Sequence, residues 1–264
     1  MKRILSFVTL AAVTLGLTSC FEMKSVVTVN KDGSATIEET ALLGAQLKAM
    51  LGGGGANEPG NPAAGLKEMV PDKAKAEERA KKLGEGVTVK SHEEVTLPDG
   101  RGGVKVTYAV ADINKLKYTP LASKGPEAGN EPERPMTFKL DGGTLTVTSP
   151  DDKPKSTTPV EKPKIPKEQM AAQVAMMKPM VAGMRMTVEL KSASGIASSD
   201  ATNVAGDTVT FLDVEFDKLL EKPEVFGEMM ESGDNMTQAE AAEKFKNIPG
   251  IKMEGKKTFK VVLK

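Results

Sequence analysis

The chain contains one cysteine and one histidine, Cys20 and His92, so any thiol or imidazole chemistry depends on these two residues. A catalytic pair needs its nucleophile and its base within hydrogen-bond reach of each other. In the stretch VTVKSHEEVTL, strict alternation would place Val87 and Val95 on an apolar face and His92 on the opposite, solvated face. The serine-hydrolase patterns GxSxG and SxxK are also absent. We therefore expect a protein that is not an enzyme.

Two other stretches have residue types that suit ion binding. Asp213, Glu215 and Asp217 alternate along LDVEFDK, and carboxylates in a row could contribute to a calcium site, but the stretch lacks a spaced DxDxDG loop. We prefer a solvated strand end. Residues 250–257 (GIKMEGKK) nearly match a phosphate-binding P-loop, but Lys257 stands where Ser or Thr must follow the lysine. That segment is predicted to be a hairpin turn.

The segment 170–186 contains six of the fifteen methionines. Three interpretations are open: adaptable core packing, which we favour, an apolar ligand groove, and a copper(I) site, because thioethers are soft ligands. Helical spacing would line the groove with Met170, Val174, Met177, Val181 and Met184. The copper(I) site would use Met176 and Met180. We expect no cofactor otherwise.

The N-terminus has the order of a secretory signal: Lys2 and Arg3, an apolar stretch too short to span a bilayer comfortably, then small residues. Residues 17–20, Leu-Thr-Ser-Cys, resemble the lipobox of bacterial lipoproteins. The resemblance implies cleavage before Cys20, a diacylglyceryl group on its thiol and acylation, for example by palmitate, of the new amine. Two or more acyl chains anchor a protein stably. Phe21 stands where an aspartate often retains lipoproteins in the inner membrane, so the resemblance favours the outer membrane, facing the periplasm, in a diderm cell.

The elements behind these residues are mostly strands joined by tight turns. Asp32-Gly33, between two alternating runs, is a strong hairpin signal. Further hairpins are predicted over 86–110, 136–148 and 184–216, with two final strands over 251–254 and 257–263. Helices are predicted over 41–51, 66–83 with its start near Pro71, 165–177 and 239–246, the last associated with a capping box of Thr237 and Glu240. This order predicts an α+β fold: an antiparallel sheet built from several β-hairpins, with helices packed on one side and disordered insertions rich in Gly and Pro.

The chain divides into a signal peptide, residues 1–19, and a single extracytoplasmic domain, residues 20–264. A weak sequence similarity between KVTYAVADINKL and TVTFLDVEFDKLL suggests two duplicated units, 66–118 and 165–222. Compositional bias predicts flexible tracts at 52–65, 119–135 and 149–167. Lys and Arg total 36, as do Asp and Glu, so loss of Lys2 and Arg3 leaves a formal charge of −2, and no nucleic-acid partner is indicated.

The hairpin VTVNKDGSATIEET and the later GMRMTVELKSASGIASSDAT and TVTFLDVEFDKLL resemble a group of uncharacterised bacterial lipoproteins. The likeness extends distantly to the LppM-type lipoprotein ectodomain. It implies an extracytoplasmic α+β domain that binds a lipid or another envelope component, and it supplies no catalytic residues. We therefore expect a lipid-anchored, non-enzymatic protein that binds such a component or scaffolds an envelope protein. The alternative is a copper(I)-binding protein that uses segment 170–186.

Overall fold

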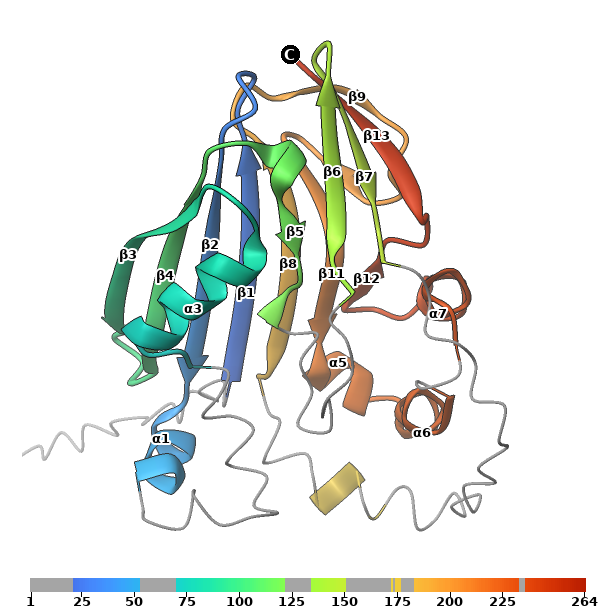
Figure 1. The fold of residues 1–264 in the computed structure, drawn as a ribbon. Helices are drawn as coiled ribbons and strands as arrows, with labels where there is room; N and C mark the ends of the chain where they lie inside the picture. The colour runs from blue at the N-terminus through green and yellow to red at the C-terminus, as the bar shows by residue number, and fades with distance from the viewer. Residues whose placement is uncertain are drawn as a thin grey trace, which may run out of the picture.

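The predicted α+β class is confirmed, with the strands in two sheets (Figure 1). The computed structural model describes residues 21–52, 70–121, 134–150, 172, 174–176, 183–232 and 236–264. Within these ranges, the large sheet has the order β10 (Val204–Ala205), β11 (Thr208–Glu215), β8 (Arg185–Ser192), β1 (Phe21–Val29), β2 (Ala35–Leu43), β4 (Gly102–Val110) and β3 (Val87–Thr96). A short strand, β12 (Ile251–Met253), also pairs with β11.

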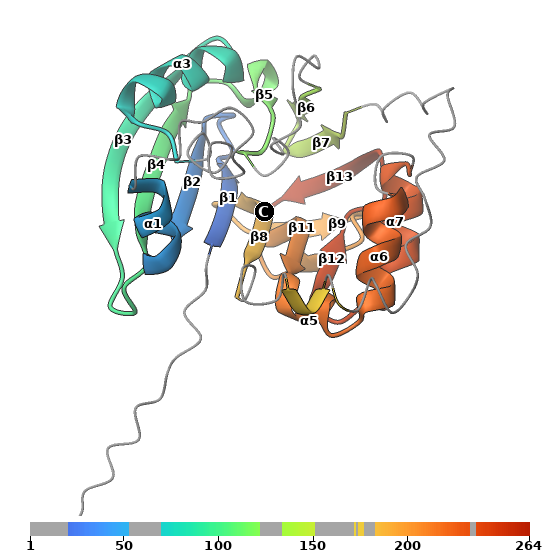
Figure 2. The ribbon, with the colours of Figure 1, turned by 90° about the horizontal axis from the view of Figure 1, so that it is seen from below.

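The small sheet has the order β5 (Lys117–Tyr118), β6 (Met136–Asp141), β7 (Thr144–Thr148), β13 (Thr258–Leu263) and β9 (Ile196–Ser199). The described helices include α1 (Ala45–Gly52), α3 (Lys73–Leu83), the 3₁₀ turn η2 (Ile113–Lys115), α5 (Phe216–Leu220), α6 (Pro223–Ser232) and α7 (Gln238–Phe245), and residues 174–176 are also helical. Helix α3 and the small sheet lie side by side over one face of the large sheet, as Figures 1 and 2 show. The main core therefore fills the space between these two layers.

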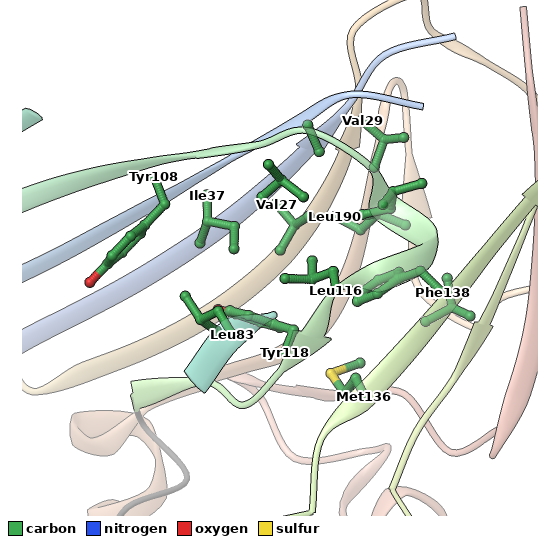
Figure 3. Close-up of a cluster of buried hydrophobic side chains, with 14 of the residues drawn as sticks. Val27, Val29, Ile37, Leu83, Tyr108, Leu116, Tyr118, Met136, Phe138 and Leu190 are labelled. Atoms are coloured by element: carbon green, nitrogen blue, oxygen red, sulfur yellow. The ribbon is translucent and has the colours of Figure 1, made fainter. Parts of the chain in front are cut away.

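Buried side chains of both layers form one continuous cluster in that space (Figure 3). Tyr108, Ile37 and Val27 come from neighbouring strands of the large sheet. Opposite them, Leu83 ends helix α3 and Tyr118 belongs to β5. Burial of aliphatic and aromatic side chains of this size stabilises a fold by about 1.5–3 kcal/mol per side chain. The alternation of buried and half-buried residues along β4 and most of β2 reflects this one-sided burial.

The turns that the sequence predicts are present. At Asp32-Gly33, the Ser34 amide and hydroxyl both donate to Asp32 Oδ1, at 2.9 and 2.7 Å, and Gly33 has a φ of +86°. A glycine adopts that left-handed conformation without steric cost. The capping box is also confirmed, with Thr237 and Glu240 each accepting the other's backbone N–H.

Three boundaries differ from the prediction. Residues 41–43 continue β2 instead of starting a helix, because Leu43 pairs with both Phe21 and Gly102 in neighbouring strands. Helix α3 begins at Lys73, after Asp72 rather than near Pro71, since the Asp72 side chain accepts the Lys75 N–H at 2.8 Å. The residues 251–263 are not a hairpin. Strand β12 pairs with β11 of the large sheet, whereas β13 pairs with β7 and β9 of the small sheet.

One strand pair is parallel, which local hairpin signals could not indicate. Strand β8 runs alongside β1, with registered pairs from Glu22 and Arg185 to Val29 and Ser192. Strands β1 and β2 form a hairpin between the two proposed duplicated units. Strand β4 of unit 66–118 pairs with β2, whereas β8 of unit 165–222 pairs with β1. The duplication stays a prediction. The predicted flexible tracts fall almost wholly on 53–69, 122–133 and 151–171, outside the described residues.

Candidate functional site

A buried ion pair joins helix α3 to the large sheet. Glu39 of β2 is 1% exposed and Arg79 of α3 is 9% exposed. Arg79 Nε and one of its terminal nitrogens donate to the two Glu39 carboxylate oxygens at 2.8 and 2.6 Å. The same terminal nitrogen also donates to the Thr119 carbonyl oxygen at 2.6 Å. Burial lowers the pKa of Arg79, but the adjacent Glu39 carboxylate outweighs it and the pKa is raised overall.

The sequence contained a signal for this pair that we did not use. Glu39 alternates with Ile37 and Ala41, which are buried on the same face of β2, so it is a charged residue in an otherwise apolar row. Such a residue needs a partner, because an unpaired charge in a protein core is strongly destabilising. Arg79 lies forty positions away and could not be assigned as that partner by spacing alone.

Both tyrosines of the chain lie beside this ion pair. Tyr108 and Tyr118 are 0% exposed, and neither hydroxyl has a hydrogen-bond partner among the described residues. Burial is the main cause that raises the pKa of each phenol, and the negative charge of Glu39 raises both further. The cluster of Glu39, Arg79, Tyr108 and Tyr118 is closed to solvent and we assign it a structural role.

His92 is not on the solvated face that strict alternation predicts. A bulge leaves Lys90 out of register, since Val89 pairs with Tyr108 and Ser91 with Thr107. The extra residue moves the side chains that follow it to the opposite face of the strand from the one expected, so His92 pairs directly with the buried Val106. Its Nε2 donates to the Pro71 carbonyl oxygen at 2.9 Å, next to the start of α3. The imidazole therefore helps to hold the helix on the sheet.

The three carboxylates of LDVEFDK do not form a row. Arg185 donates to both oxygens of Asp213 at 2.8 Å, and Glu215 lies 3.5 Å from the same guanidinium. Strand β11 ends at Glu215, so Asp217 lies in α5, where it accepts the Gly183 N–H at 2.8 Å. In the described part of the chain, no group of His, Cys, Asp and Glu is arranged to hold a metal ion.

The segment that resembles a P-loop is a crossover between the sheets. Its carboxylate, Glu254, is 0% exposed and accepts from the Thr202 amide at 2.6 Å, the Thr202 hydroxyl at 2.7 Å and the Lys256 amide at 2.9 Å. These donors come from the chain itself. Glu254 therefore fixes the course of the chain from β12 to β13.

Two residues of the predicted methionine groove lie in different clusters. Val174 is 5% exposed and packs with residues of α5, α6 and α7, including Leu219 and Phe245. Met184 is half-buried against Phe21 and its neighbours at the start of β1. Met170, Met177 and Val181 lie outside the described residues, and the groove stays a prediction. For the copper(I) alternative, Met176 is 76% exposed and Met180 lies outside the described residues, so that also stays a prediction.

The chain enters the fold at Phe21, the residue after Cys20. Cys20 lies outside the described residues, but Phe21 is 2% exposed and pairs with Leu43 in β2. It packs with Met23, Leu43 and Leu121, and Leu47 and Met184 lie half-buried against this cluster. Helices α1 and α5 lie at the same end of the large sheet (Figure 1). Within the described ranges, no helix has the length and apolar character needed to cross a membrane.

Comparisons with known proteins give little further support. No protein-family model matches the chain, and no curated protein sequence matches it. Among solved structures, the NMR structure of the folded domain of LppM from Mycobacterium tuberculosis is similar over 75% of this chain and 83% of that domain, with 12% identity and a TM-score of 0.28. A similarity this low does not establish a common fold or function. The lipoprotein assignment therefore depends on the residues around Cys20.

We expect Glu39→Ala to lower the free energy of unfolding by about 3–5 kcal/mol, because it leaves the Arg79 guanidinium buried without its partner. The double variant Glu39→Met, Arg79→Met should lose less than the single variant, since it buries no charge. The measurement is urea unfolding followed by circular dichroism. Glu38→Ala is the matched control: Glu38 forms a partly exposed pair with Lys105 on the other face and should change the stability by less than about 1 kcal/mol. Equal losses for Glu38→Ala and Glu39→Ala would contradict the buried pair.

The two tyrosines provide a second test, by pH titration. Their folded pKa values are raised above 10.0, so above that pH the native state binds more protons than the unfolded state. Their contribution to stability is therefore complete below pH 10.0 and is lost as the pH rises through the folded values. In the folded protein, tyrosinate absorbance should stay constant past pH 10.0 and rise only at the pH where circular dichroism shows unfolding. In the urea-unfolded protein, the tyrosines should titrate near pH 10.0. Titration near 10.0 in the folded protein would show that the hydroxyls reach solvent.

A third test separates core packing from a groove around Val174. Val174→Ala should destabilise the protein by about 1–2.5 kcal/mol, since it removes buried methyl groups from the cluster with Leu219 and Phe245. Met176→Ala, two residues away and exposed, should change the stability by less than about 0.5 kcal/mol. Thermal unfolding of both variants measures the difference. A Val174→Ala variant as stable as the parent would argue against core packing.

Proposed function

We propose that this chain is a lipid-anchored, non-enzymatic protein of the cell envelope, which binds an envelope component or scaffolds another envelope protein. Its compartment would be extracytoplasmic, and in a diderm cell the outer membrane facing the periplasm. The observation that carries the proposal is the position of β1. The strand begins at Phe21, so an acylated Cys20 would be followed directly by a buried, paired residue.

This arrangement leaves no linker between anchor and domain. Acyl chains on Cys20 would hold the end of the large sheet at the bilayer surface. The half-buried apolar side chains at that end, Leu47, Met184 and Met186, would then face the lipid headgroups. Each buried methylene of the acyl chains contributes about 0.8 kcal/mol, so two chains suffice for stable attachment without a membrane-spanning helix.

The buried carboxylates support a non-enzymatic role. Glu39 and Glu254 already accept hydrogen bonds from the chain's own donors, and Asp213 forms a two-pronged pair with Arg185. A general acid or base must instead be free to exchange a proton with a substrate. These groups therefore stabilise the fold, and the binding role rests on surfaces.

The anchor is tested by replacing its thiol. In a bacterial host, the mature chain with Cys20→Ser, exported behind a leader that is cleaved without lipid attachment, should be found in the soluble fraction, because no acyl group can be attached. Ser19→Ala keeps a small residue before the cut and is the control that should stay in the membrane fraction. Mass spectrometry of the purified wild-type chain should find residue 20 as an acylated N-terminus. An unmodified cysteine, or a Cys20→Ser variant that remains membrane-bound, would overturn the proposal.

A further inference from the structure

An open cleft with a positively charged lining lies beside the end of helix α3. It has a volume of about 730 Å³ and is lined by Lys81, Lys82, Gly84, Glu85, Gly86, Val87, Lys115 and Lys117. Four lysines and one glutamate give this lining a formal charge of +3. The whole chain has equal numbers of acidic and basic residues, so the charge is a local feature.

The four lysines come from two segments that a glycine allows to meet. Lys81 and Lys82 end α3, whereas Lys115 and Lys117 belong to η2 and β5. Gly84 has a φ of +138°, and a Cβ at this position would lie 2.4 Å from the Lys115 carbonyl oxygen. The turn after α3 can therefore pack against the second segment only with glycine at position 84.

Two of the lysines already have acidic partners. Lys115 lies 2.9 Å from Glu85, and Lys82 lies 3.3 Å from Glu78, with both pairs well exposed. Lys81 and Lys117 have no ion-pair partner among the described residues, and both are exposed. The two lysines on α3 also offset the partial negative charge at the end of the helix. Lys117 lies on β5, an edge strand of the small sheet, where a charged side chain also opposes pairing with other chains.

The cleft lies far from the proposed anchor. Val87 at its edge is in register, through Val110 and Ala35, with Val29 at the end of β1. Phe21 is at the other end of the same strand, eight residues away, which corresponds to about 26 Å. Because no linker separates Cys20 from β1, headgroups of the anchoring membrane do not reach the cleft when the strand stands away from the bilayer.

We propose that this cleft binds an anionic glycan of the cell envelope, away from the membrane that holds the anchor. The proposal rests on the proposed function, from which it takes the compartment. The cleft is open to solvent rather than enclosed, so it suits an extended polymer lying across the lysines more than a small ligand that a pocket must surround. Lysines present point charges to carboxylate groups without demanding one geometry, which fits a repeating polymer.

The test is co-sedimentation of the soluble mature chain carrying Cys20→Ser with insoluble peptidoglycan, whose peptide stems bear carboxylates. The parent should bind, binding should weaken with added salt, and Lys81→Glu, Lys117→Glu should weaken it by about tenfold. Lys31→Glu, Lys252→Glu is the matched control, because it changes the net charge equally at exposed lysines outside the cleft and should stay within about twofold of the parent.

Competition with inorganic phosphate and binding to lipid vesicles test whether the cleft binds a free anion or a lipid headgroup instead of the glycan. Inorganic phosphate should displace peptidoglycan no better than equal ionic strength of chloride, and vesicles containing phosphatidylglycerol should not bind in a way that depends on Lys81 and Lys117. No co-sedimentation, equal losses in the two double variants, selective displacement by phosphate, or cleft-dependent binding to vesicles would each overturn the glycan proposal. Since the assay uses an unanchored chain, its failure leaves the lipid anchor untouched, and failure of the anchor leaves this result standing.

Discussion

The ion pair of Glu39 and Arg79 is the interaction on which the rest of the molecule depends. A carboxylate on the core face of β2 is tolerable only with a cation over it, and Arg79 is that cation. Helix α3 must therefore lie across the large sheet, where the His92 contact with the Pro71 carbonyl oxygen holds its start. The position of α3 in turn places the turn at Gly84 and the lysines around it. A charge within the core thus determines a feature of the surface.

Much of the fold could be predicted from local signals. The Asp32-Gly33 turn and the capping box at Thr237 each depend on a few adjacent residues, and both are present as expected. The errors occurred where distant partners decide the outcome. Residues 41–43 are spaced like a helix but pair with strands on both sides, and the parallel partner of β1 is more than 150 positions away. A single extra residue at Lys90 reversed the face assigned to His92.

The candidate sites also differ in whether a local sequence pattern indicates them. Cys20 could be proposed as a lipidation site because the residues before it form a short contiguous pattern, and this stays a prediction. The lysine cleft could not, since Lys81 and Lys117 belong to separate segments that meet only when α3 is in place. Pairing of Glu39 with Arg79 was equally out of reach, although the odd charge in an apolar row was visible. Local patterns indicate which residues are unusual, and the fold decides what they contact.

The place of β13 has a consequence for biogenesis. This strand, residues 258–263, follows all the other strands of the small sheet in the sequence, yet it lies between β7 and β9 inside that sheet. Until these residues leave a ribosome or a translocation channel, β7 and β9 have unpaired edges, and exposed edges recruit other chains. The small sheet therefore closes only after β13 has been synthesised. A chain that stops before residue 258 would lack an interior strand, and its unpaired edges would favour misfolding and aggregation.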